Sequence, residues 1–184
     1  MEEILACSIM FISHKQRATA LVWNSHLGGV YMSDRGTDGW AVAPGEGIRV
    51  EPGGKHWLEV LVRGTDVDGA LGAFVFTHDV IPAGVPAHAH HGFMKILYVL
   101  EGQYEFRVGD AEFSGGPGTV VVVPRGSSHV FSTETGGRVL FVCSPAGNEE
   151  LFLELGRLGP NPTPEQLADL DARFQTTGNM HDDA

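Results

Sequence analysis

Short runs of apolar and β-branched residues, separated by turns rich in glycine and proline, follow one another through the middle of this chain. Residues 103–108 alternate apolar and polar side chains, a period of two that is typical of a strand with one buried face. Gly109-Asp110 then predicts a tight hairpin. The valine run within 119–123 predicts a strand buried on both faces. The strands predicted on these grounds span residues 47–50, 57–63, 71–80, 93–100, 103–108, 111–113, 119–123, 128–133 and 137–143.

The pattern becomes helical towards the C-terminus. Apolar spacing in 149–155 predicts a short helix, capped by Asn148 and ended by Gly156. Residues 163–166, Thr-Pro-Glu-Gln, combine the spacing of a capping box with proline at the first helical position. They predict a second helix over 164–174 with one apolar stripe. We expect both helices to pack outside the sheet.

This order of elements divides the chain into four parts. Many short strands with glycine-rich turns, and no alternation of strands with helices, predict an all-β sandwich or barrel. We assign 1–40 to an N-terminal extension and 41–146 to the barrel. Residues 147–175 form short C-terminal helices packed on the barrel, and 176–184 a flexible tail.

Composition and charge narrow the class of partner and the compartment. The net charge is −11, which argues against nucleic acid or an anionic membrane surface as a partner. The apolar stretch Ile4–Ile12 follows acidic residues and is too short to span a bilayer, which indicates a non-secretory protein. Met32 is a plausible alternative start, so 1–31 can be an extension. Cys7 and Cys143 form no CxxC pair, and we expect free thiols in the cytoplasm.

Three histidines carry the candidate chemistry. His88 and His90 are two positions apart, so on a strand both side chains point to one face, roughly 7 Å apart at the backbone. His91 points to the other face. His129 begins the strand after the turn at 124–126 and can face the same cavity. Three neutral imidazoles suit one divalent transition metal, and they do not choose among Fe, Mn, Ni, Cu and Zn.

The two histidine segments resemble the two motifs of the cupin family. Over residues 40–175 the chain looks like small bacterial single-domain cupins described as quercetin-dioxygenase-like. The resemblance implies a jelly-roll β-barrel, a divalent metal inside it, a homodimer, and reactions that range from dioxygenation to isomerisation, lyase chemistry and plain ligand binding. The residues that carry it are Gly84, His88, His90, Lys95 and Gly102 in the first motif, and Gly118, Pro124, Gly126, His129 and Thr133 in the second.

The chain departs from the family pattern at two positions. The first motif usually carries a glutamate ligand where Lys95 stands, and the second usually carries asparagine where Thr133 stands. An ammonium about 5 Å from a dication would be repelled by on the order of 6–7 kcal/mol at an effective dielectric near 20. Lys95 is therefore neutral, or pairs with an acid, or no metal binds. A neutral lysine can act as base or nucleophile, and a charged one can stabilise an anion. We assign Lys95 a catalytic role, which makes flavonol dioxygenation itself doubtful.

Three functions follow from this site. The first is a metal-dependent oxygenase of specialised metabolism acting on a small aromatic or enolisable molecule. The second is a non-oxidative cyclase, isomerase or lyase with Lys95 as acid or base, and the third is a non-catalytic cupin that binds a small ligand. All three need an apolar pocket. Its predicted lining is Phe74, Phe76, His78, Leu97, Val99, Phe131, Thr133 and Phe141.

Overall fold

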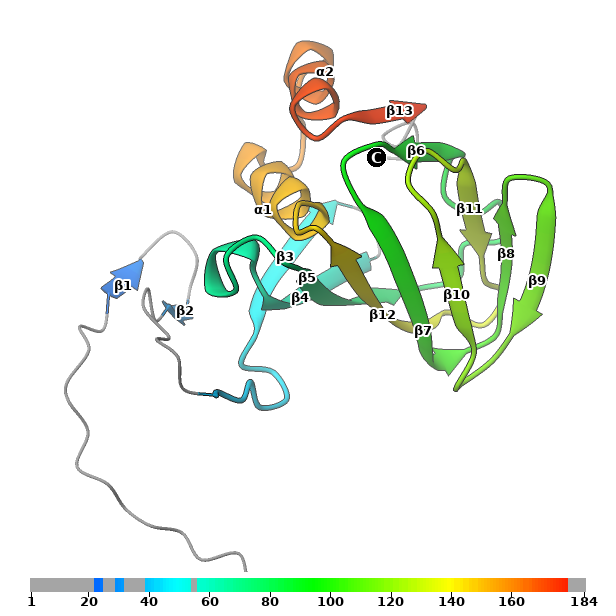
Figure 1. The fold of residues 1–184 in the computed structure, drawn as a ribbon, viewed down its shortest axis with the longest axis horizontal. Coiled ribbons are helices and arrows are strands. Elements are labelled where there is room, and N and C mark those ends of the chain that lie inside the picture. Colours follow the sequence, from blue (N-terminus) through cyan, green and yellow to red (C-terminus); the bar gives the residue numbers. More distant parts are fainter. Residues whose placement is uncertain (1–21, 25–28, 32–38, 54–55, 179–184) are drawn as a thin grey trace, which may run out of the picture.

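The computed structural model describes residues 22–24, 29–31, 39–53 and 56–178 (Figure 1). Everything that follows about the structure concerns these residues. Several features singled out in the sequence lie outside them, namely the apolar stretch Ile4–Ile12, Cys7, Met32 and the end of the predicted tail, 179–184.

Two large antiparallel sheets, a two-stranded sheet and two helices are the main elements of the described part of the chain (Figure 1). A single 3₁₀ turn, Gly64–Asp66, is the one helical segment described before residue 148. The helices are α1 (Asn148–Leu158) and α2 (Pro164–Arg173). The strands are β1 (Val22–Asn24), β2 (Gly29–Tyr31), β3 (Ile48–Gly53), β4 (His56–Val62), β5 (Gly72–His78), β6 (His88–His90), β7 (Met94–Gly102), β8 (Tyr104–Val108), β9 (Ala111–Gly115), β10 (Val120–Val123), β11 (His129–Ser132), β12 (Gly137–Ser144) and β13 (Thr176–Gly178).

The larger sheet has the order β10-β7-β12-β5-β4-β3 and the smaller one the order β13-β6-β11-β8-β9, while β1 and β2 pair only with each other. Inward-facing side chains of both sheets form one buried cluster. Within it, the ring of Phe131 from the smaller sheet lies 6.1 Å from that of Phe141 in the larger one. The predicted all-β barrel is confirmed, with its core between the two sheets.

The hairpin predicted at Gly109-Asp110 is confirmed, because Val108 pairs directly with Ala111 and leaves a two-residue turn. The prediction for the valine run is wrong. Strand β10 lies at the edge of the larger sheet, and its side chains alternate between buried and exposed. Val122 is 51% exposed because the outer face of the sheet is uncovered at this edge. An apolar run does not by itself reveal whether both faces of a strand are covered.

Both predicted ends of α1 need correction. Gly147 is the N-cap, and Asn148 is a buried residue of the helix itself. The helix also continues through Gly156 and ends at Leu158, with Gly159 as its C-cap. Gly156 has a packing role, because a Cβ there would lie 2.7 Å from Cγ1 of Val50. Tertiary contacts therefore override the local end signals.

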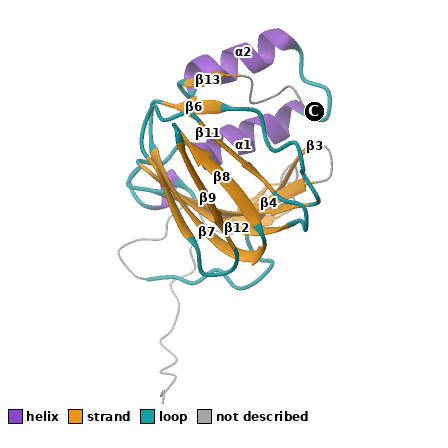
Figure 2. Cartoon of the chain, turned by 90° about the vertical axis from the view of Figure 1, so that its right-hand side faces the viewer, coloured by secondary structure: helices purple, strands orange, loops and turns teal. Residues whose placement is uncertain are grey.

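Glu149 ties the start of α1 to the barrel. Its side chain is fully buried, and its two carboxylate oxygens accept the main-chain N–H groups of Gly64 at 2.9 Å and Gly147 at 3.0 Å. Further along α1, the ring of Phe152 lies 5.5 Å from those of Phe74 and Phe76. Helix α1 thus packs over the barrel, as Figure 2 shows.

The second helix agrees with its sequence signature. Gln166 Oε1 accepts the Thr163 N–H at 2.8 Å and Thr163 Oγ1 accepts the Gln166 N–H, so the capping box is present. Leu170 packs against α1. The predicted flexible tail, however, begins as a strand, because Thr176–Gly178 pairs with β6. Neither helix in the described ranges is long and apolar enough to cross a membrane.

Candidate metal centre

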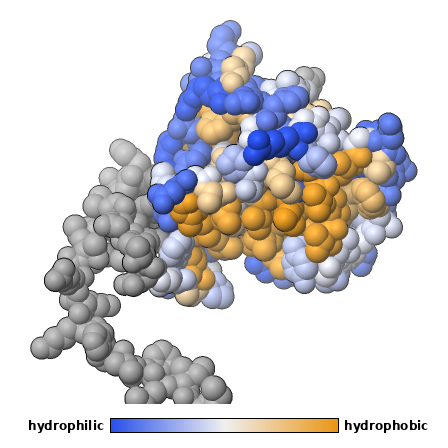
Figure 3. Space-filling model, viewed as in Figure 1, coloured by the Kyte–Doolittle hydropathy of each residue, from blue (hydrophilic) through white to orange (hydrophobic). Residues whose placement is uncertain are grey.

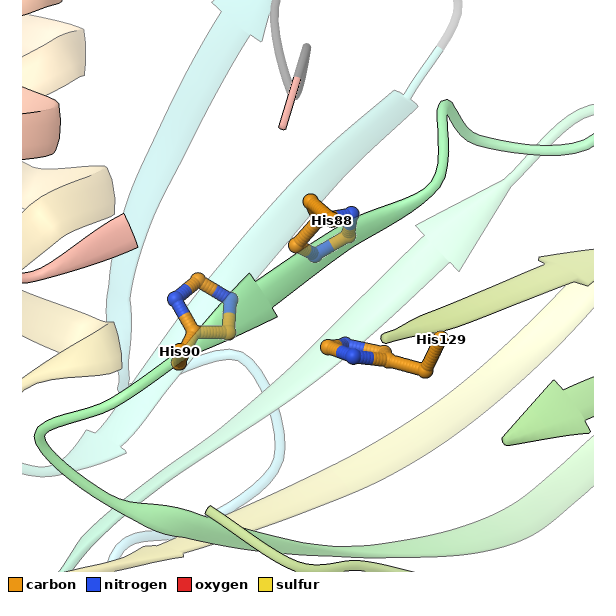
Figure 4. Close-up of side chains that lie close together, drawn as sticks. All are labelled: His88, His90 and His129. Carbon is orange, nitrogen blue, oxygen red and sulfur yellow. The ribbon is translucent and has the colours of Figure 1, made fainter. Parts of the chain in front are cut away.

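The barrel brings the three predicted histidines together (Figure 4). β6 supplies His88 and His90, and β11 supplies His129, which pairs directly with His88. One ring nitrogen from each of the three lies within 4.8 Å of the others. All three side chains are buried, so water competes little for these nitrogens.

The main chain orients two of the three rings. His88 Nδ1 lies 2.7 Å from the carbonyl oxygen of Pro86, and His129 Nδ1 lies 3.2 Å from that of Ser127. A carbonyl oxygen only accepts, so both Nδ1 atoms carry a proton and donate it. The lone pair of each neutral ring is therefore on Nε2. Metal-binding histidines are commonly held in this way by a second hydrogen bond.

His90, the third histidine of the cluster, contacts a side chain instead of a main-chain carbonyl oxygen. Its Nδ1 lies 3.0 Å from Oγ1 of Thr176, and its buried Nε2 has no hydrogen-bond partner among the described residues. Burial, followed by the charge of Lys95, lowers the pKa of His90 and brings that of His129 to about 2. Both rings are thus neutral at neutral pH, as metal ligands must be. The donor set fits a divalent transition metal.

Lys95 is the residue that does not fit. It is 4% exposed, and its Nζ lies 3.2 Å from Nε2 of His129. No ion pair between Lys95 and an acid occurs in the part of the chain that the structure describes, which contradicts one of the three predicted solutions. Burial lowers the pKa of Lys95 to about 8, opposed by Cys143. The lysine N–H and a metal ion would use the same lone pair of His129, so they exclude each other.

His91 lies outside the cluster, as predicted. Its side chain is exposed, and its Nε2 lies 3.0 Å from Oγ1 of Thr177. Two residues beside the histidines were missed in the sequence. Phe93 stacks on His90, with ring centroids 4.7 Å apart, and Thr176 contacts His90 from the C-terminal strand. Nothing in the polar tail sequence indicated this second contact.

The predicted pocket residues all face the interior, although they differ in what they contact. The Phe141 ring lies 5.8 Å from Lys95 Nζ and so borders the site. His78 Nδ1 instead contacts Tyr104 Oη at 3.1 Å, and Thr133 donates its hydroxyl to the carbonyl oxygen of Gly136. The six apolar residues belong to the buried cluster between the two large sheets: Phe74, Phe76, Leu97, Val99, Phe131 and Phe141.

Comparison with known proteins agrees with this architecture. Residues 77–145, which include all three histidines and Lys95, match a family model described as a cupin domain. The fold is that of a cupin. None of the curated proteins matches the chain significantly.

Solved structures with the same fold are distant in sequence. An RmlC-like cupin from Shewanella frigidimarina NCIMB 400 is 22% identical, with 65% of this chain and 99% of that one covered and a TM-score of 0.53. KdgF from Halomonas sp. is 18% identical, with 60% and 99% covered and a TM-score of 0.54. A variant of Streptomyces PAC13 with uridine is 16% identical, with 62% and 88% covered and a TM-score of 0.50. At such identities the likeness concerns the fold alone.

Proposed function

We propose that this cupin is a metal-dependent oxygenase acting on a small aromatic or enolisable substrate. His88, His90 and His129 would hold one divalent transition metal. The observation that carries the proposal is the contact that each Nδ1 makes with a residue outside the three-histidine cluster, which directs the three Nε2 atoms to the ion once Lys95 Nζ has moved from that of His129. A bound ion supplies a Lewis acid with open coordination positions.

The surroundings of the three histidines support an apolar or aromatic substrate. Phe93 stacks on His90, and the rings of Phe93 and Phe141 lie within 6 Å of Lys95 Nζ, at 5.9 and 5.8 Å. Such a shell excludes water and strengthens electrostatic interactions inside the site. A small molecule in the cytoplasm, rather than nucleic acid or a membrane, remains the expected partner.

The placement of Lys95 favours a second candidate, a non-oxidative cyclase, isomerase or lyase. Its Nζ is buried, contacts His129 and has no carboxylate beside it among the described residues. A lysine in such a site can give or take a proton at Nζ without O₂. A cupin that only binds a small ligand is the third possibility.

Metal analysis and O₂ consumption distinguish these functions. Freshly purified protein and a Lys95→Glu variant are analysed for transition metals, then incubated with enolisable phenols and diketones. Stoichiometric metal together with substrate-dependent O₂ uptake supports the oxygenase. Turnover without O₂ uptake supports the acid–base enzyme, and bound metal without turnover supports a binding protein. Metal near zero in the wild type that rises in Lys95→Glu overturns the three-histidine metalloenzyme.

We also propose that the protein is a homodimer. Outward-facing side chains of β10, β7 and β12 form two uncharged rows across the larger sheet. Figure 3 shows an apolar patch on this side of the barrel. An uncharged face suits a second copy of the same acidic chain, because it brings no like charges into contact. The rows are Val122, Ile96 and Val142, and Val120, Tyr98 and Leu140.

A further inference from the structure

We propose that Thr176, in the C-terminal strand β13, is a positioning residue for the metal ligand His90. Its hydroxyl holds the imidazole in the tautomer that presents the Nε2 lone pair to the ion. This inference rests on the proposed metal centre, and it adds to that centre a segment that lies outside both histidine motifs.

Main-chain pairing fixes where the hydroxyl sits. β13 runs antiparallel to β6, with Thr176 opposite His90 and Gly178 opposite His88. The His91 N–H donates to the carbonyl oxygen of Gln175 at 2.9 Å, which continues the pairing. The strands approach so closely that a Cβ at Gly178 would lie 2.9 Å from Cα of His88. Figure 1 shows β13 beside β6 at the end of the barrel.

His90 differs from the other two histidines in the kind of partner it has. Main-chain carbonyl oxygens can only accept, so they impose the tautomer of His88 and His129. The Thr176 hydroxyl, 3.0 Å from Nδ1, can accept or donate. If it donated, the proton of His90 would be on Nε2, which is buried and has no partner in the described chain. Nε2 lacks a partner in either tautomer of the metal-free ring. A metal ion would satisfy it only when Nε2 carries the lone pair, which is the tautomer in which Nδ1 donates its proton to the Thr176 hydroxyl.

The consequence is that the C-terminal segment completes the site. Thr176 is buried, whereas the next residue, Thr177, is exposed, and its hydroxyl contacts the bystander His91. The two threonines therefore make the same kind of contact with two different histidines. Only the contact to His90 bears on the metal, which makes Thr177 a matched internal control.

The test compares Zn²⁺ affinity in three variants of the full chain. Thr176→Val keeps the shape and removes the hydroxyl, Thr176→Ser keeps the hydroxyl, and Thr177→Val removes the control hydroxyl. Dissociation constants are measured by competition with a chromophoric chelator. Loss of a partner of this kind weakens metal binding about 10- to 100-fold, and we expect this for Thr176→Val. Thr176→Ser and Thr177→Val should bind like the wild type.

Nitrogen-15 NMR of the His90 ring in metal-free protein provides a second readout. The wild type and Thr176→Ser should be protonated at Nδ1, and Thr176→Val should lose this preference. Protonation at Nε2 in the wild type overturns the inference without any variant. Zn²⁺ binding that is equal in the wild type and Thr176→Val also overturns it and leaves the metal centre standing. If the wild type binds no Zn²⁺, the metal centre fails, and the NMR comparison alone decides the role of Thr176.

Discussion

Replacing Lys95 by methionine should strengthen Zn²⁺ binding, because the lysine occupies the lone pair that the metal needs. Nζ lies 3.2 Å from Nε2 of His129. A Zn–N bond is about 2.0–2.1 Å long, so an ion on the same lone pair would lie roughly 1 Å from Nζ. The two cannot occupy these positions together, so metal binding to the wild type must move Nζ away, either as the charged ammonium or after it has lost its proton.

The route with the lower free-energy cost determines how much Zn²⁺ affinity Lys95→Met should gain. A charged ammonium moved to about 5 Å from the dication costs on the order of 6–7 kcal/mol at a dielectric near 20. Burial lowers the pKa of Lys95 to about 8, so removing its proton at pH 7 costs only about 1.4 kcal/mol. The lost hydrogen bond to His129 adds about 1 kcal/mol. Deprotonation is therefore the less costly route, at about 2.4 kcal/mol together with the lost hydrogen bond. Since Lys95→Met avoids this cost, it should bind Zn²⁺ roughly 50-fold more tightly at pH 7.

The same reasoning fixes the sign of the pH dependence. Zn²⁺ binding releases the lysine proton, so wild-type affinity should rise with pH below 8 and level off above it. Lys95→Met has no such proton, and burial, the largest cause of the low pKa of His129, remains in the variant and keeps that ring neutral near pH 7 and above. The advantage of the variant should therefore shrink at alkaline pH.

Chelator-competition titrations of the wild type and Lys95→Met, below and above pH 8, measure both effects. Arg125→Met is the matched control, since it removes an exposed cation four positions before His129 and should leave affinity unchanged. Equal Zn²⁺ affinity of wild type and Lys95→Met at pH 7 would refute the competition between lysine and metal. A gain that is the same at every pH would refute the deprotonation route.

Three further predictions concern stability and assembly. Burial lowers the pKa of His78 to about 3, so below pH 6.5 this residue binds a proton in the unfolded chain but not in the folded protein. His78 alone should therefore reduce the unfolding free energy by about 2 kcal/mol from pH 7 to pH 5. In urea unfolding, His78→Gln should lose less stability over this pH range than the wild type. Val122→Glu places a charge on the outer apolar rows and should yield monomers in light scattering, while an unchanged mass would exclude this face as the dimer interface. In Gly72→Ala the new methyl would overlap the buried carboxylate of Glu149, and we expect a loss of about 3 kcal/mol or more on urea unfolding; a wild-type midpoint would contradict it.

Local patterns predicted those parts of the fold that local interactions determine. The two-residue hairpin at Gly109-Asp110 and the capping box at Thr163 depend on neighbours in sequence, and both are present. The exposure of β10 depends on its place at the sheet edge. The true end of α1 depends on the close packing of Gly156 against Val50. Neither of these could be predicted from periodicity alone.

In the candidate site, too, local spacing predicted some features, and others depend on contacts between distant parts of the chain. The spacing of His88 and His90 placed both side chains on one face, because a strand alternates its faces. The contact between Lys95 and His129 joins opposite sheets of the barrel, and no spacing within either motif encodes it.

Thr176 is the extreme case, since it lies 86 positions from His90. Two consecutive threonines in a polar tail resemble any solvent-exposed terminus. They reach the histidine strand only because α2 ends at Arg173 and returns the chain to the free edge of β6. A ligand whose tautomer is set by such a distant hydroxyl can lose affinity through changes that leave both cupin motifs intact. The match of a chain to those motifs is therefore insufficient to establish that its metal centre is complete.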